Sequence, residues 1–208
     1  MLQFTNEYLN VGNCEEAHYG LKKINGCLEQ FKEPMLQPEF VAELINTMTL
    51  ALEVSAKSKK EVLEEWGNPK EMDEIETEDF EYEYNIPNNL THAVMAASMD
   101  LIKLFGPALE EIMIQKVGGY FFLQMKSPVV EDDIHYACCF YAEFFRFCSQ
   151  EVCEKGYAAV MQYILPSALE TETVNYQQSA GYLFGVIFFK KFLSNSIESC
   201  TQTFARTV

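Results

Sequence analysis

Hydrophobic side chains recur along this chain at the spacing of α-helices. The clearest stripe lies within residues 131–148 and consists of Ile134, Ala137, Cys138, Tyr141, Phe144, Phe145 and Cys148. Side chains three and four positions apart share one side of a helix, so this stripe predicts an amphipathic helix that faces a core. Similar patterns predict helices over residues 2–11, 14–31, 38–66, 87–105, 107–125, 151–168 and 174–193. We therefore expect an all-α protein.

The expected helix starts repeat along the second half of the chain. Pro87, Val130 and Val174 are spaced by roughly 43 residues, the period of HEAT or armadillo repeats. Each start is followed by a helix, a turn and a partner helix. This pattern predicts an α-solenoid of about four antiparallel helix hairpins, with the second helices lining one face.

One stretch interrupts this regular pattern. Glu71 to Tyr84 reads EMDEIETEDFEYEY, with eight carboxylates and no basic residue. Self-repulsion and few aliphatic side chains predict a loop or mobile segment rather than packed structure. Because the distance from Cys14 to Pro87 is one period plus about 30 residues, we interpret residues 67–86 as an insertion in the solenoid.

Three interpretations of this acidic segment remain open. It could be a solubilising linker, a contact for a basic partner, or a latch onto Lys57, Lys59, Lys60 and Lys70 of the same chain. Interleaved aromatic and acidic side chains could both steer and anchor a partner. The candidate partner-binding residues are Glu71, Asp73, Glu74, Glu76, Glu78, Asp79, Phe80, Glu81, Tyr82, Glu83 and Tyr84.

Composition narrows the expected function classes. Apolar residues make up 49% of the 208 residues and the net charge is -16. This charge argues against sequence-independent binding of DNA or RNA and favours basic protein partners. The longest apolar run, 182–189, is too short to insert into a membrane.

The chain offers little catalytic or metal-binding chemistry. Its seven cysteines contain no CxxC pair and are expected to be reduced thiols, mostly buried, as in cytosolic or nuclear proteins. Cys138 and Cys139 near His135 resemble a nucleophile and base, but Cys138 falls on the core stripe. We expect no catalytic residue, no cofactor and no metal site, and hence no enzyme.

Two stretches resemble a known family. Asp133 to Phe144, DIHYACCFYAEF, resembles the second helix of a HEAT repeat in the importin-β (karyopherin-β) superfamily, nearest the importin-5 type. Tyr176 to Val186, YQQSAGYLFGV, is similar to the next second helix of that family. An acidic loop after an extended helix lies two repeats upstream in the same family. HEAT helices of this family commonly carry an arginine that pairs with an aspartate of a neighbouring repeat. In this chain Ile134 and Gln177 occupy the two arginine positions, although Asp133 is present.

The resemblance implies a segment of a nuclear transport receptor. Such a receptor shuttles between cytoplasm and nucleus, binds basic cargo proteins, contacts Phe-Gly nucleoporins and releases its cargo when it binds Ran in the GTP form. A scaffold subunit built from HEAT repeats, of the phosphatase or chromosome type, is the alternative function. The very apolar 182–192 region, followed by a polar tail, also leads us to expect that the parent chain continues beyond Val208.

Overall fold

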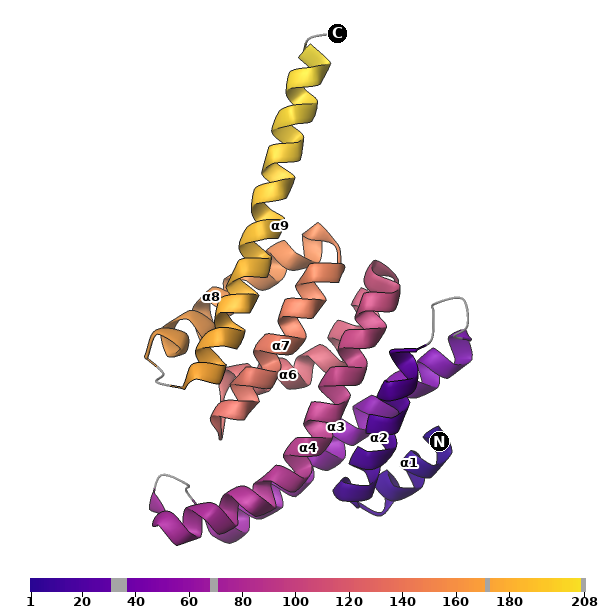
Figure 1. Ribbon diagram of the computed structural model, residues 1–208, viewed down its shortest axis with the longest axis vertical. Coiled ribbons are helices and arrows are strands. Elements are labelled where there is room, and N and C mark those ends of the chain that lie inside the picture. Colours follow the sequence, from indigo (N-terminus) through magenta and orange to yellow (C-terminus); the bar gives the residue numbers. More distant parts are fainter. Residues whose placement is uncertain (31–36, 68–70, 171–172, 207–208) are drawn as a thin grey trace. The chain divides into compact units, whose positions relative to one another are not determined.

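The computed structural model shows an all-helical protein (Figure 1). It describes residues 1–30, 37–67, 71–170 and 173–206, with the backbone alone at 131, 159–161, 165, 167–170 and 191–206. It is 90% helical, and these residues contain no strand. The expectation of an all-α protein is confirmed.

The chain divides into two compact units of similar size. The first, Met1–Leu104, contains three helices and nearly all of a fourth; the second unit is Phe105–Val208. The elements of the first are α1 (Leu2–Asn10), α2 (Cys14–Leu28), α3 (Pro38–Trp66) and α4 (Glu74–Phe105). Those of the second are the 3-10 turn η3 (Gly106–Leu109), α5 (Glu110–Met113), the π-helical turn η4 (Ile114–Gly118), α6 (Gly119–Lys126), α7 (Glu131–Phe147), α8 (Gln150–Glu170) and α9 (Val174–Arg206).

The helix boundaries in the first unit follow local sequence signals. Pro38 occupies the first turn of α3, where its fixed φ suits a helix start and no amide hydrogen is needed. Gly67 ends α3 with a φ of 86°, a conformation that costs a residue with a side chain much more. Asn13 caps α2 by accepting a hydrogen bond from the amide of Glu16 at 3.1 Å.

The core of the first unit follows the predicted apolar stripes. α1 and α2 pack against each other and against α3. The buried members of the predicted stripes in α2, α3 and the second half of α4 are Ala17, Leu21, Ile24, Leu28, Val41, Leu44, Ile45, Met48, Leu52, Leu90, Val94, Ala97 and Leu101. Gly20 permits the close approach of α1, since a Cβ there would lie 2.3 Å from the hydroxyl of Thr5.

Two of the three helix starts that define the predicted repeat are correct. α7 begins at Glu131 after its cap Val130, and α9 begins at Val174, as expected. Pro87 does not begin a helix; it lies inside α4, which starts at Glu74 and curves along its length (Figure 1). A proline in a helix interior removes one hydrogen bond and bends the axis without having to end the helix.

Three other predicted boundaries also shift. The helix expected over 107–125 is divided into η3, α5, η4 and α6. α8 is one helix from Gln150 to Glu170 that contains Pro166, and α9 runs on to Arg206 rather than ending near residue 193. Phe31, the expected end of the second helix, lies outside the described residues.

The second unit is organised around α7. Every residue of its predicted stripe is buried, and Phe140 stacks on Phe121 of α6 with ring centroids 4.7 Å apart. α6 and α7 are antiparallel, since Tyr141 donates a hydrogen bond to the carbonyl of Gly118 while Gln124 donates one to Asp133. α7 and α9 pack against each other and are parallel. Their contacts join residues 39, 36 and 42 positions apart: Glu143 with Tyr182, Arg146 with Tyr182, and Cys148 with Lys190.

Asp133 fixes the turn before α7. Its carboxylate is buried and accepts hydrogen bonds from the amides of Val129 (3.0 Å) and Val130 (3.4 Å) and from the side chain of Gln124 (3.0 Å). A carboxylate at the third helical position satisfies amides that the helix itself leaves unpaired. Asp133 therefore serves as a helix cap in this protein.

Candidate functional site

The acidic segment is helical, and the expectation of a loop is wrong. Residues 74–84 form the first three turns of α4. The helix begins at a reciprocal cap. The Asp73 carboxylate accepts from the amides of Ile75 (3.0 Å) and Glu76 (2.9 Å), while the Asp73 amide donates to the Glu76 carboxylate (3.1 Å). Carboxylates in the first turn are also favoured by the helix dipole.

Two aromatic residues of the segment attach it to the rest of the first unit. Phe80 and Tyr84 are only 1% and 2% exposed, and their ring centroids lie 5.4 Å apart. Four residues separate them, so they share one face of α4. They belong to the core, so the prediction that they bind a partner is wrong.

The partner of this face is the second half of α3. The hydroxyl of Ser55 lies 2.8 Å from the carbonyl oxygen of Pro87 and 2.8 Å from the hydroxyl of Thr91. Farther along, the indole of Trp66 donates to the carboxylate of Glu83 at 2.9 Å. α3 and α4 thus form an antiparallel pair that extends to the end of α3.

Of the lysines considered for a latch, Lys59 contacts the segment. The Lys59 ammonium lies 5.1 Å from the centroid of the Tyr84 ring, and the lysine is 5% exposed. Lys57 and Lys60 instead form ion pairs with Glu61 and Glu64 of their own helix. Lys70 lies outside the described residues.

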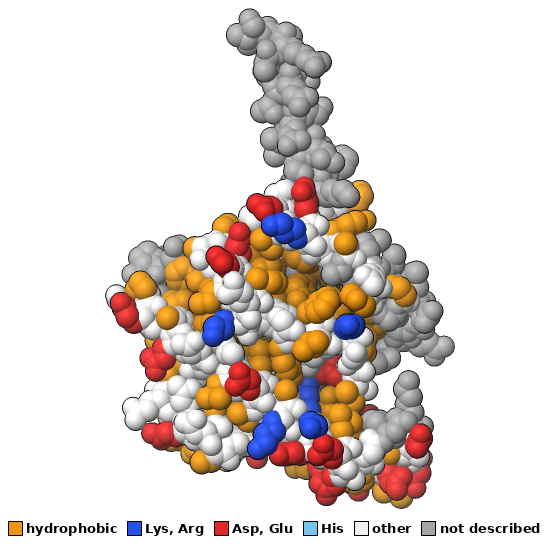
Figure 2. All heavy atoms as spheres, turned by 180° about the vertical axis from the view of Figure 1, so that it is seen from behind, with side chains coloured by type: hydrophobic (Ala, Val, Ile, Leu, Met, Phe, Trp, Pro, Cys, Tyr) orange, Lys and Arg blue, Asp and Glu red, His pale blue; other side chains and the backbone are white. Residues whose placement is uncertain are grey.

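The opposite face of the same three turns is acidic with an apolar centre. Ile75 and Tyr82 are 72% and 73% exposed, and their spacing of seven residues places them two turns apart on one side of α4. The exposed carboxylates of the candidate site are Glu71, Asp73, Glu74, Glu76, Glu78, Asp79 and Glu81, while Glu83 is half-buried. Figure 2 shows carboxylates gathered at the lower right. We call Ile75, Tyr82 and the carboxylates of residues 74–81 the acidic face.

The acidic face has the chemistry of a protein-binding surface. Exposed carboxylates attract basic side chains over a distance of about one Debye length, roughly 8–10 Å at physiological salt. Exposed Ile75 and Tyr82 could then be buried by a partner, which supplies the short-range part of the binding energy.

Sequence reasoning missed two signals that bear on this site. Asp73 and Glu76 have the spacing of a capping box, which marks a helix start. Phe80, Tyr84 and Thr91 also fall at intervals of four and seven, a helical period. The alternation of Phe80, Tyr82 and Tyr84 with glutamates does not indicate a helix. Ile75 is therefore absent from the candidate residues, although it shares a helix face with Tyr82.

The thiols near His135 lie within the packing of the second unit. Cys138 is fully buried, and burial raises its pKa to about 12; burial likewise raises the pKa of Cys139 to about 11. The sulfur of Cys139 lies 3.9 Å from Nε2 of His135. A nucleophilic cysteine requires a lowered pKa, so this pair is not organised for nucleophilic attack.

Comparison with known proteins identifies no family for the chain. No protein-family model, no curated protein and no solved structure matches the chain. Within the described part of the chain, no helix has both the length and the hydropathy of a membrane span.

Proposed function

We propose that this chain is a protein-binding helical segment, without enzymatic activity, that uses the acidic face of α4 to bind a basic surface of a partner protein. One observation carries the proposal: Ile75 and Tyr82 are about 70% exposed among carboxylates, on a helix whose other face is fixed by buried Phe80 and Tyr84. A helix held in place by its own core loses little conformational freedom on binding, which favours affinity.

We further propose that the hairpins belong to a HEAT-like α-solenoid. The parallel course of α7 and α9, with contacts near 40 residues apart, supports this, because equivalent helices of successive repeats are related in that way. The sequence resemblance supports a more specific role as a segment of an importin-β-like transport receptor that shuttles between cytoplasm and nucleus. In that role it would bind basic cargo, Phe-Gly nucleoporins or Ran·GTP. A scaffold subunit remains the second candidate.

The test is association kinetics with a basic probe, a mixture of core histones, at two ionic strengths. In the test variant, Glu74, Glu78, Asp79 and Glu81 become Gln or Asn, which leaves the Asp73–Glu76 cap and Glu83 intact. A control variant with Glu29, Glu39, Glu43 and Glu53 changed to Gln loses the same charge from other exposed positions of the first unit. The acidic-face variant should associate about tenfold more slowly at low salt and with a flatter salt dependence, while the control changes by less than about threefold.

A second pair of variants tests the apolar centre of the acidic face. Ile75→Ser with Tyr82→Ser should raise the dissociation rate and keep the salt dependence, because buried apolar side chains anchor a complex while charges steer it. Equal effects of the acidic-face and control charge variants would refute the proposed site and leave only a general charge effect. Release of the bound histones by Ran·GTP would favour the transport role; binding without such release would favour the scaffold role.

A further inference from the structure

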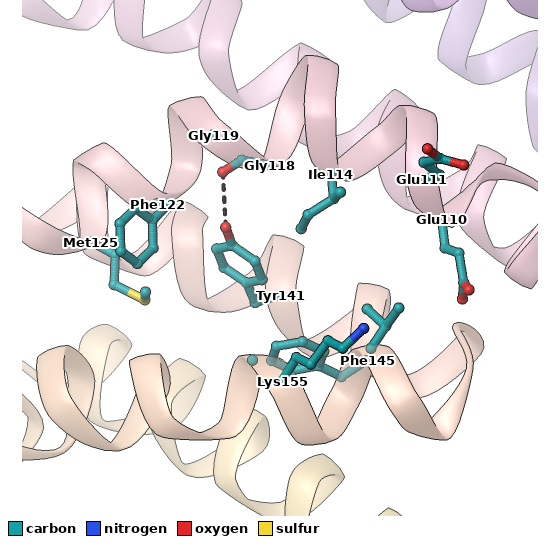
Figure 3. Close-up of a pocket in the computed structure, with 12 residues that line it drawn as sticks. Glu110, Glu111, Ile114, Gly118, Gly119, Phe122, Met125, Tyr141, Phe145 and Lys155 are labelled. Carbon is teal, nitrogen blue, oxygen red and sulfur yellow. Dashed lines mark hydrogen bonds between the residues drawn. The ribbon is translucent and has the colours of Figure 1, made fainter.

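The second unit contains a cavity of about 520 Å³ between the segment 110–125, α7 and α8. Its walls are apolar side chains from all three elements: Ile114, Phe122, Met125, Tyr141, Phe145 and Val152. In Figure 3, Phe122 and Met125 lie at one end, and Glu110 and Glu111 lie at the other. A volume of this size matches sites that hold small organic molecules, which usually occupy about 300–1,000 Å³.

Three of the residues that line the cavity are glycines: Gly118, Gly119 and Gly156. At Gly118 a Cβ would lie 2.8 Å from the side chain of Ile114, another lining residue. At Gly156 a Cβ would lie 2.2 Å from the ring of Phe145, which shows how closely α8 approaches α7. A Cβ at Gly119, in contrast, would have no atom within 4 Å.

The hydroxyl of Tyr141, in the wall of the cavity, is already hydrogen-bonded. The hydroxyl of Tyr141 donates to the carbonyl oxygen of Gly118 at 2.8 Å, at the end of the π-helical turn, and this bond is drawn in Figure 3. Tyr141 therefore presents its ring, rather than a free hydroxyl, to the space beside Ile114. The middle of the cavity suits an apolar body.

Charged groups stand at one end. The carboxylate of Glu110 is held by the amide of Ser149 (2.8 Å) and by its hydroxyl (3.0 Å), and each carboxylate oxygen can accept a further hydrogen bond. Glu111 is exposed at the same end, and its carboxylate accepts a hydrogen bond from the side chain of Gln115 at 3.3 Å. Lys155 also lines the cavity; its ammonium is paired with Glu151 at 2.6 Å and is attracted by Glu110 as well. Three carboxylates, those of Glu110, Glu111 and Glu151, thus surround one ammonium, and this end keeps a net negative charge.

We propose that this cavity binds a small molecule with an apolar, aryl or alkyl body and a cationic amine at one end. The body would lie along Phe122, Tyr141 and Phe145, and the ammonium would face Glu110 and Glu111. The proposal concerns the second unit alone and does not depend on the function proposed for the acidic face.

The experiment compares three probes that share one body and differ at the end: 4-phenylbutylamine, 4-phenylbutanol and 4-phenylbutyrate. Binding is followed through the methyl signals of Ile114 and Met125 in spectra of the methyl-labelled full chain. For ligands of this size we expect dissociation constants on the order of a millimolar. The amine should bind about two- to fivefold more tightly than the alcohol, and the acid most weakly.

Two variants locate the site. Gly119→Leu adds a side chain at a residue that lines the cavity, where a Cβ meets no atom within 4 Å, and should weaken all three probes at least tenfold, without loss of helix content, since leucine favours helices. The matched control is Gly181→Leu in α9, where a Cβ also meets nothing within 4 Å and which does not line the cavity. Its affinities should equal those of the unaltered chain.

A third variant tests the charge. Glu111→Gln should reduce the advantage of the amine over the alcohol and leave the alcohol unchanged. Absence of saturable shifts with all three probes, undiminished binding by Gly119→Leu, or an acid that binds as tightly as the amine would each overturn the proposal.

Discussion

At the scale of single residues, Phe80, Tyr82 and Tyr84 have different roles despite their regular alternation. Phe80 and Tyr84 are buried against the first unit, whereas Tyr82 is 73% exposed. Their positions on α4 explain the difference, since residues 80 and 84 lie on one face and residue 82 lies nearly opposite. Substitutions at these three positions should therefore separate folding from binding.

We expect Phe80→Ala to lower the free energy of unfolding by about 3–5 kcal/mol, the usual cost of removing a buried aromatic ring. Tyr82→Ala, the control two positions away in the same helix, should change it by less than about 0.5 kcal/mol. Urea unfolding of both variants measures the difference. Similar values for the two variants would mean that the segment is not docked.

Buried thiol and phenol groups should make the protein sensitive to alkali. Burial raises the pKa of Cys138, Cys148 and Tyr136 to about 12. An acid whose pKa is raised on folding stabilises the protein fully below its unfolded pKa, near 9 for a thiol, and this stabilisation is lost as the pH rises toward 12. The contribution of Cys138 alone should fall by on the order of 2 kcal/mol between pH 8 and pH 11.

Urea unfolding at pH 8 and pH 11 tests this expectation. Cys138→Ala should unfold more easily at pH 8 but show a smaller loss between the two pH values than the unaltered chain. Cys27, which is exposed, provides the control, and Cys27→Ala should keep the full loss. A pH-independent stability up to pH 11 would contradict the protective burial of these groups.

At the scale of elements, the first half of α4 carries the acidic face, so the proposed binding depends on whether this half is ordered. It is one helix with the better-buried second half, and Trp66, Ser55 and Lys59 of α3 contact it. Amides of residues 78–90 should therefore exchange with solvent slowly, at rates within about tenfold of those in α7, because opening them requires separation from α3. Hydrogen exchange followed by mass spectrometry measures these rates. Exchange of the segment within seconds would restore the interpretation as a mobile linker.

Trp66→Phe provides a local control for this prediction. It keeps an aromatic ring but removes the donor to Glu83. Exchange should become faster near residue 83 and remain unchanged in α7.

At the scale of the whole molecule, two compact units suggest two cooperative transitions. Trp66, the single tryptophan, lies in the first unit and reports its unfolding, whereas far-UV dichroism reports both. The two curves should not coincide in urea, since the units have separate cores. Phe80→Ala should move the fluorescence transition to lower urea by about 1–3 M, and Phe140→Ala in the second unit should leave it in place. Coincident transitions that respond equally to both substitutions would show a single cooperative unit.

Three features follow from the local sequence alone: the helical class, the core face of α7 and the start of α3 at Pro38. These features depend on the spacing of apolar residues and on proline stereochemistry, which act within a few turns of the chain. The sequence also contained the Asp73–Glu76 cap, although the carboxylate content around it favoured a loop.

Whether the acidic segment is docked depends on contacts between helices that are distant in sequence. Its few apolar side chains cannot stabilise a helix alone, and they do so here because Phe80 and Tyr84 are buried against a neighbouring helix. That surface on α3 includes Ser55 and Lys59, two polar residues that are buried where they contact α4. The cavity beside Gly119 likewise depends on three elements distant in sequence, whose distances no local pattern specifies.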